Sequence, residues 1–177
     1  MRLFHFSDNP GIDTFIPRPV RVPAQRPPGL EYLNDPLVWA IHEERQGMYL
    51  FPRDCPRILL WRTPETTQED FERWWQGSNA EMLAYVEEEW LERVRTATLY
   101  RYELPTHSFA DLHDAGMWVS RETVKPLKLE VLTNPLSELE ECGVDVRVVD
   151  DLSLLKNVWN TSLHASGIRL RNARNWR

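Results

Sequence analysis

Three short stretches of the sequence carry side chains that suit nucleotide binding and chemistry at a sugar. His5 and Ser7 stand two residues apart, so on a strand they project to one face and offer hydrogen bonds to a ribose or an amide. Tyr49 supplies a ring that could stack on a flat ligand ring. Glu122 is a carboxylate near a predicted strand end, where it would stabilise developing positive charge.

Each of these residues also has an ordinary structural interpretation. His5 suits a histidine that is hydrogen-bonded locally in a buried strand, and Tyr49, among apolar neighbours, suits a core aromatic residue. Glu122 lies close to Arg121 and Lys125 and would form an exposed ion pair with either of them. The sequence leaves both interpretations open.

A second group of candidate residues lies near the C-terminal end. An imidazole, a hydroxyl and two guanidiniums occur within eight residues, namely His164, Ser166, Arg169 and Arg171. Gly167 permits a bend among them, and this set suits the binding of a phosphate or carboxylate. The alternative is that the basic segment 165–177 neutralises the acid-rich stretch 65–92 of the same chain.

Prolines dominate the span 10–36 and exclude a regular helix there, so we expect an ordered, extended loop. The loop carries Arg18, Arg21 and Arg26, which suit an anionic ligand as well as they suit solvent. We count Arg18 among the candidate cofactor-binding residues, together with His5, Ser7 and Tyr49.

The sequence lacks a recognised spacing of metal ligands and the standard nucleotide-binding motifs. The stretches 42–44 and 111–114 contain His, Asp and Glu, but neither gives three ligands at a recognised spacing, so we expect no metal. The sequence contains no G-x-G-x-x-G, P-loop, H-E-x-x-H or G-x-S-x-G motif. A bound nucleotide would therefore be held mainly by side chains.

Strands are predicted where short apolar or alternating runs end in turn residues. These runs cover 3–7, 37–41, 57–61, 99–104, 117–120, 127–131 and 144–148. In the run 127–131, Leu127, Leu129 and Val131 alternate with Lys128 and Glu130.

Helices are predicted where apolar residues recur every three or four positions. Thr66 with Glu69 forms a capping box before a helix over 68–75, and Ser78 with Glu81 forms another before a longer helix reaching about residue 95. On that longer helix, the glutamates 87–89 and 92 would face water. Further helices are predicted from Asn134-Pro135 up to Gly143 and over 152–159.

The mixture of strands and helices lacks a regular βαβ alternation and indicates an α+β class. We expect a single domain over 1–177, with a mixed or antiparallel split sheet flanked by helices. The chain has 177 residues and a net charge of −6, which argues against a protein whose whole surface binds nucleic acid. Cys55 and Cys142 lack metal-site spacing, and no stretch has the length of a signal peptide or membrane span. These observations predict a cytoplasmic protein with two free thiols.

Two resemblances to known families extend these expectations. The order of the His5-Phe6-Ser7 strand, the Tyr49 segment, residues 100–105 and residues 118–127 resembles the ADP-ribosyltransferase-like fold. That resemblance implies NAD as cofactor, with His5 and Ser7 on the ribose and nicotinamide amide, Tyr49 on the nicotinamide ring and Glu122 orienting the sugar. The whole chain also resembles an uncharacterised bacterial family that shares the His-Phe-Ser opening and the ending at 163–169.

Three functions follow as hypotheses. The first is a nucleotide- or NAD-binding domain, with ribosyl or phosphoryl transfer at His5, Tyr49 and Glu122. The second is a non-catalytic module that binds an anionic small molecule or a nucleic-acid end through arginines. The third is a protein-interaction domain that uses exposed tryptophans such as Trp74, Trp75 and Trp176.

Overall fold

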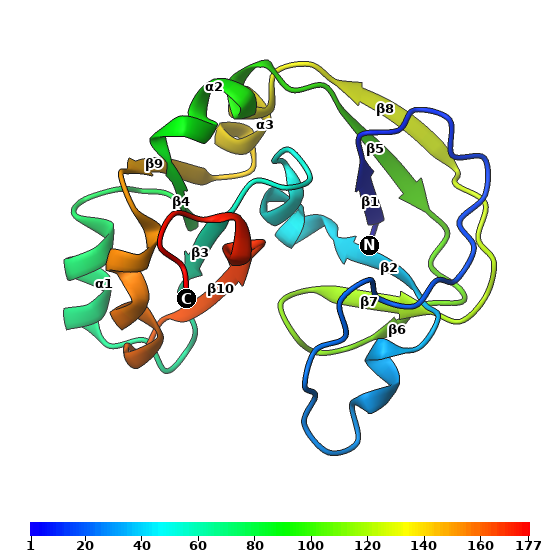
Figure 1. Ribbon diagram of the computed structural model, residues 1–177, viewed down its shortest axis with the longest axis horizontal. Helices are drawn as coiled ribbons and strands as arrows, with labels where there is room; N and C mark the ends of the chain where they lie inside the picture. The colour runs from blue at the N-terminus through cyan, green and yellow to red at the C-terminus, as the bar shows by residue number, and fades with distance from the viewer. The chain divides into compact units, whose positions relative to one another are not determined.

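The computed structural model describes all 177 residues and confirms an α+β architecture with two sheets (Figure 1). The chain, expected as one domain, divides into two compact units, each built from two separate stretches of sequence. Unit 1 comprises Met1–Gln46 and Tyr100–Val131, and unit 2 comprises Gly47–Leu99 and Leu132–Arg177. The sheets, clusters and contacts of each unit are therefore described in turn.

Unit 1 is built on a six-stranded sheet with the order β6-β7-β2-β1-β5-β8. Its elements are β1 (Leu3–Ser7), η1 (Glu31–Asn34), β2 (Val38–His42), β5 (Leu99–Leu104), β6 (Ala110–Asp111), β7 (Met117–Ser120) and β8 (Lys128–Leu132). Strand β1 lies between β2 and β5 and pairs antiparallel with both. One apolar cluster packs Leu3, Tyr102 and Phe15 together, so the loop that contains Phe15 covers this face of the sheet.

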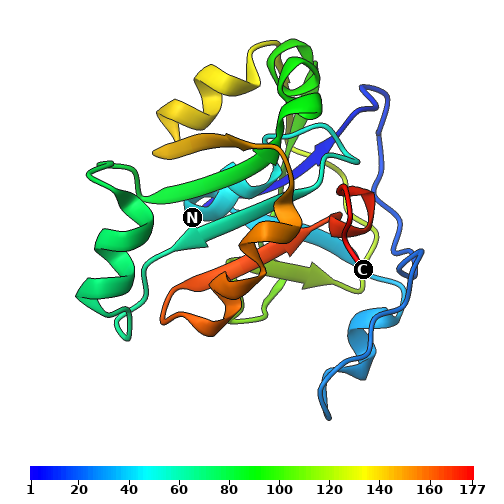
Figure 2. The ribbon, with the colours of Figure 1, turned by 60° about the vertical axis from the view of Figure 1, so that its left-hand side comes forward.

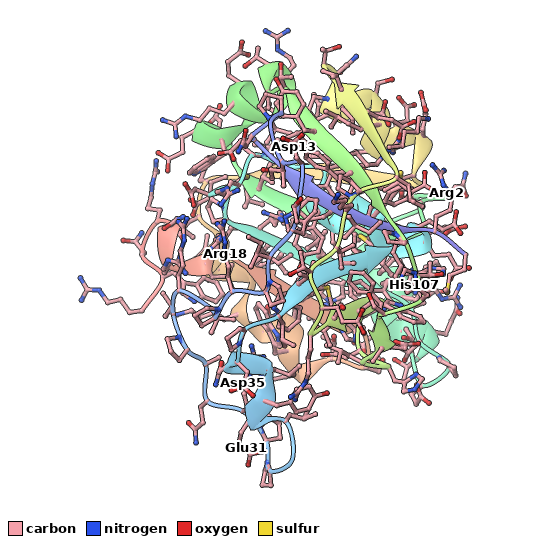
Figure 3. The ribbon with its side chains drawn as sticks, turned by 90° about the vertical axis from the view of Figure 1, so that its right-hand side faces the viewer. Arg2, Asp13, Arg18, Glu31, Asp35 and His107 are labelled. Atoms are coloured by element: carbon pink, nitrogen blue, oxygen red, sulfur yellow. The ribbon has the colours of Figure 1, made fainter.

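The Pro-rich loop 10–36 is ordered by short backbone pairings, as expected. Phe15 pairs with Val124 and Arg18 pairs with Leu37, each through two backbone hydrogen bonds. Figure 3 shows the loop passing from Asp13 through Arg18 toward Glu31 and Asp35. The only regular structure in the loop is the single 3₁₀ turn η1.

Unit 2 is built on a four-stranded sheet with the order β10-β3-β4-β9. Its elements are β3 (Arg57–Trp61), α1 (Gln68–Trp75), β4 (Met82–Glu87), α2 (Glu88–Thr96), α3 (Pro135–Glu141), β9 (Val144–Val149), η3 (Leu152–Asn160), β10 (His164–Ile168) and η4 (Leu170–Asn172). The 3₁₀ segment η2 (Glu43–Tyr49) joins β2 to this half of the chain. Strands β4 and β9 run parallel, and the other pairings of this sheet are antiparallel.

The core of unit 2 lies between its sheet and the segments α1, η3 and the C-terminal stretch. Ile58 and Leu83 from the strands contact Trp75 of α1, Val158 of η3 and Ala173 in one buried cluster. Figure 2 shows η3 in orange and the C-terminal stretch in red beside the strands β3 and β10. No helix in the structure combines the length and the apolar character needed to span a bilayer.

The long helix predicted from Ser78 to about residue 95 is wrong in its first half. Residues Met82–Glu87 form β4, and the helix α2 begins only at Glu88. The run Met82–Val86 is apolar at every position, and every one of these residues is buried because β4 lies inside the sheet. A fully buried strand and a helix segment share this pattern, so the spacing of three to four was coincidental. Glu87, expected in water, is buried.

The capping predictions were partly wrong as well. Helix α1 occupies Gln68–Trp75 as predicted, but its N-cap is Thr67, which accepts a hydrogen bond from Asp70 N at 3.2 Å. Ser78 caps no helix and instead accepts a hydrogen bond from Ala80 N in a turn. Helix α3 begins as predicted with Asn134 as N-cap, whose side chain accepts from Ser137 N.

Candidate functional site

His5 and Ser7 lie on β1 of unit 1, and their contacts are to neighbouring protein groups. His5 Nδ1 lies 2.8 Å from the Trp39 carbonyl, and its ring centroid lies 4.8 Å from that of Phe15. Ser7 is buried, and its hydroxyl accepts the backbone N–H of Asn9 at 3.1 Å. These contacts fix the turn after β1 and order the start of the Pro-rich loop.

Glu122 is exposed just after β7, where its backbone N–H donates to the Ser120 hydroxyl at 3.1 Å. The segment that carries it returns to the β1 region through Val124, whose backbone pairs with Phe15. Since the Phe15 ring also contacts His5, Phe15 links His5 to the Glu122 segment. Both of these candidate residues belong to unit 1, whereas Tyr49 belongs to unit 2.

Arg18 is exposed on the Pro-rich loop (Figure 3). Its backbone donates to and accepts from Leu37, so its position in the chain is fixed while its side chain lies at the surface. Arg21, on the same loop, is exposed too, and Arg26 is half-buried. The loop therefore presents Arg18 and Arg21 at the surface of unit 1, whereas Arg26 Nε is buried without a hydrogen-bond partner.

The C-terminal candidates His164 and Ser166 lie on β10, a strand that was not predicted from the sequence. Strand β10 pairs with β3 so that Trp61 faces His164, Leu59 faces Ser166 and Arg57 faces Ile168. Directly opposed residues share one face of a sheet, and the next pair on that face lies two residues away. His164, Ser166 and Arg57 are therefore on the same face, and the His164 ring stacks on Trp61 at a centroid distance of 4.0 Å.

Arg169 follows β10 and occupies the left-handed region with φ 56°. Its Nε donates to the Arg53 carbonyl at 3.2 Å, and Asn172 Nδ2 donates to the Asp54 carbonyl at 2.8 Å, so the turn is fastened to the loop before β3. The bend expected at Gly167 thus occurs at Arg169. Gly167 instead permits close packing, because a Cβ there would collide with Leu170 Cδ1.

Arg171 differs from Arg169 in its surroundings. It lies in η4 and is exposed, and no hydrogen bond or ion pair connects its side chain with the rest of unit 2. The structure therefore brings three of the four predicted anion-binding residues to the β10 end of the sheet and leaves Arg171 outside.

Arg57 is a candidate residue that was not predicted from the sequence. It opens β3 and is only 2% exposed, although a charged residue before an apolar run usually marks an exposed strand end. Its Nε donates to the Met48 carbonyl at 2.8 Å and its Nη1 to the Cys55 carbonyl at 2.9 Å. The rings of Phe51 and Tyr49 lie 5.0 and 5.7 Å from its guanidinium carbon.

No carboxylate accompanies this buried guanidinium. Arg57 forms no ion pair, and its Nη2 donates no hydrogen bond within the protein. Burial lowers the pKa of Arg57 to about 10, Cys55 and Tyr49 oppose that change, and the like charge of Arg169 adds a smaller lowering effect. We call Arg57, Arg169, Ser166 and Tyr49 the Arg57 cluster. His164 lies four residues along β10 from Ile168, the residue opposite Arg57, and is not part of it.

Cys55 lies beside this cluster. Its thiol is fully buried, and burial raises its pKa to about 11, although the Arg57 charge opposes that rise. Neither Cys55 nor Cys142 forms a disulfide bond. No three His, Cys, Asp or Glu side chains gather into a group that could hold a metal ion.

Comparison with known proteins places the chain in a family. Residues 4–173 match the model of a family of unknown function, DUF6886. The chain belongs to the DUF6886 family. The match confirms the resemblance to an uncharacterised family that the two ends of the sequence indicated. No curated protein and no solved structure matches this DUF6886 chain, so the resemblance to ADP-ribosyltransferases gains no support.

The predicted tryptophan surface is wrong for two of its three members. Trp74 and Trp75 are buried in the core of unit 2, while Trp176 is half-buried, 5.9 Å from Trp159 between ring centroids. The adjacent Trp74-Trp75 pair lies at the end of α1, where the helix packs on the sheet.

Proposed function

We propose that unit 2 binds a small anionic molecule, with a phosphate or carboxylate group held by Arg57 and Arg169. The observation that carries this proposal is the buried guanidinium of Arg57, which has no carboxylate partner and has one nitrogen without an acceptor. A buried charge without a counter-charge costs several kcal/mol, and a bound anion would remove much of that cost.

The position of Arg169 supports the same proposal. Arg169 directly follows Ile168, the residue opposite Arg57 on β10, and its charge makes a small contribution to the lowered pKa of Arg57. Like charges at close range repel, and an anion between them would turn that repulsion into two attractions. The left-handed backbone of Arg169 is rare for a residue with a side chain, and such conformations gather at binding sites.

The neighbouring groups indicate the kind of ligand. The Ser166 hydroxyl, one cross-strand pair from Arg57 on the same face of the sheet, could donate a hydrogen bond to a further oxygen of the same ligand. Tyr49 offers an aromatic ring at the other side of Arg57. Phosphate oxygens, hydroxyl partners and a ring in one ligand describe a nucleotide-like molecule, and NAD belongs to this class. We propose binding alone and assign no transfer step to His5, Tyr49 and Glu122.

The test is a set of calorimetric and thermal-shift titrations of the whole chain with inorganic phosphate, AMP, ADP-ribose and NAD. A ligand that binds only the folded state at 100 times its Kd stabilises that state by about 2.7 kcal/mol. We expect at least one of these anions to raise the Tm of the wild-type protein, and Arg57→Met and Arg169→Gln to abolish the effect.

Arg171→Gln is the matched control, since it removes the same charge two residues away from an exposed position. It should leave the ligand response intact. Arg57→Met leaves the Met48 and Cys55 carbonyls without a donor, so the folding of this variant is checked by circular dichroism. Arg169→Gln tests the proposal on a more exposed side chain. Equal responses of Arg169→Gln and Arg171→Gln, or no response of the wild type to any of the anions, would overturn the proposal.

A further inference from the structure

Strand β8 forms one edge of the unit 1 sheet (Figure 1), and apolar side chains are exposed along it. Leu127, Leu129 and Val131 are 67%, 39% and 58% exposed. The alternation was predicted correctly, but the polar face of β8 is the more buried one. Glu130 on that face accepts Arg101 Nε at 2.8 Å and Lys128 Nζ at 2.6 Å. An edge strand with a row of exposed apolar residues invites pairing with another strand.

The backbone of β8 determines which residues can pair outward. Leu127 N–H donates to the Glu103 carbonyl at 2.8 Å, so the polar backbone groups of Leu127 point toward β5. Strand β8 begins only at Lys128, and the Glu130 carboxylate accepts Arg101 Nε, so Glu130 lies opposite Arg101 and Lys128 opposite Glu103. Because the Glu103 carbonyl faces β8, Lys128 and Glu130 direct their backbone groups toward β5, and the N–H and C=O of Leu129 and Val131 point away from the sheet.

We infer that β8 pairs antiparallel with β8 of a second copy of this chain, about a two-fold axis at Leu129. In this register, Lys128 of each copy lies opposite Glu130 of the other, and Leu129 exchanges backbone hydrogen bonds with Leu129 of the second copy. The same register places Leu129 opposite Leu129 and Leu127 opposite Val131, so the exposed apolar residues shield one another.

Charge selects this register over its neighbours. Only the outward-facing residues can form hydrogen-bonded pairs, so the register can shift only in steps that keep Leu129 and Val131 facing the partner. An axis at Lys128 would oppose two lysines, and an axis at Glu130 would oppose two glutamates. Like charges directly opposed across strands are destabilising, whereas the axis at Leu129 gives two opposite-charge pairs. The stretch 127–131 is thus complementary to itself.

The experiment is sedimentation velocity over a concentration series, with light scattering of the eluting peak as a second measure of mass. We expect the wild type to pass from monomer to dimer as its concentration rises. Lys128→Glu should weaken the dimer at least tenfold, because both cross-strand pairs become glutamate pairs. Lys125→Glu, an equal change of charge at an exposed residue before β8, should weaken it far less.

A mixing experiment tests the register itself. Glu130→Lys should also be monomeric, because its cross-strand pairs become lysine pairs. Mixed with Lys128→Glu, it should form a mixed dimer, since each glutamate then faces a lysine. If Glu130→Lys fails to fold after losing Arg101 as a partner, the comparison of Lys128→Glu with Lys125→Glu decides. A wild type that remains monomeric throughout, or a Lys128→Glu variant that dimerises like the wild type, would overturn the inference.

Discussion

Glu87 accepts the backbone N–H of Arg174 through both of its carboxylate oxygens, at 3.0 and 3.1 Å. Its Oε1 also accepts the N–H of Leu152 at 3.1 Å, so one buried carboxylate at the end of β4 holds the start of η3 and the C-terminal stretch. The basic segment 165–177 is therefore held to the acid-rich stretch 65–92 by hydrogen bonds from its backbone as well as by opposite charge. The sequence predicts only the attraction between the charges.

The first prediction concerns this attachment. Glu87→Ala leaves two N–H groups without an acceptor in the protein and should lower the free energy of unfolding by about 2–4 kcal/mol. Glu87→Gln should lower it less, because one acceptor oxygen remains. Urea unfolding measures both changes. Glu88→Ala, at the exposed neighbouring residue, should stay within about 0.5 kcal/mol of the wild type. Equal losses at 87 and 88 would contradict the role of the buried carboxylate.

The second prediction concerns acid stability. Asp70 accepts Ser162 Oγ at 2.5 Å and Ser162 N at 2.7 Å, and these hydrogen bonds lower the pKa of Asp70 below its usual value. A carboxyl whose folded pKa is depressed stabilises the protein above its unfolded pKa, and that contribution is lost as pH falls through the folded pKa. Ser162→Ala should therefore flatten the decline of Tm on acidification.

Glu69→Gln provides the reference for that pH series, because it removes an exposed carboxylate from the same helical turn. Its Tm profile should run parallel to that of the wild type. If Ser162→Ala also runs parallel to the wild type down to acid pH, the hydrogen bonds from Ser162 do not hold the Asp70 charge.

The third prediction uses Cys55 as a reporter of the Arg57 cluster. With a pKa of about 11, the Cys55 thiol is only about 1% ionised at pH 9, and it is fully buried. In a Cys142→Ser background, alkylation by iodoacetamide should be slow in the native state and fast in urea. Arg57→Met should slow it further, since loss of the positive charge raises the thiol pKa. Faster native alkylation in Arg57→Met would mean that the variant opens this region.

The fourth prediction compares two adjacent tryptophans. Trp75 Nε1 donates to the Ala80 carbonyl at 2.8 Å, whereas Trp74 Nε1 is buried without an acceptor. Replacing each by phenylalanine removes similar volume, but only Trp75→Phe breaks a hydrogen bond. Trp74→Phe should therefore cost about 1–2 kcal/mol less than Trp75→Phe in urea unfolding. Equal costs would indicate that Trp74 Nε1 has an acceptor in solution.

Local sequence signals located most of the elements correctly. The short apolar runs at 3–7 and 57–61, and the Asn134-Pro135 start of α3, depend on neighbouring residues and were predicted close to their observed bounds. The stretch 82–87 was misread because its state depends on β3 and β9, which enclose it on both sides. Strand β10 was missed because His164, Ser166 and Gly167 are poor strand formers that pair only because β3 lies beside them.

The candidate site was predicted in part. His164, Ser166 and Arg169 were identified from their chemistry, and the sheet brings Ser166 and Arg169 toward the end of β10 that pairs with Arg57, whereas His164 begins the strand at its other end. Arg57 could not be found in this way, because the absence of a carboxylate around it is a property of the packed unit. Glu87 was placed in water for a related reason, since only the fold reveals which backbone groups need its oxygens.

Because the two units interleave in the sequence, neighbouring strands of one sheet leave the ribosome at different times. Strand β4 leaves the ribosome complete at Glu87, but its parallel neighbour β9 ends at Val149, about 60 residues later. At about 5–20 residues per second, that interval is about 3–12 s. During this time the apolar strand pair β3 and β4 has both edges open, because its other neighbour β10 is synthesised later still, and it has no cover from η3 or the C-terminal stretch. The nascent chain should therefore bind chaperones that recognise apolar strands, and slower translation of residues 88–149 should increase its aggregation.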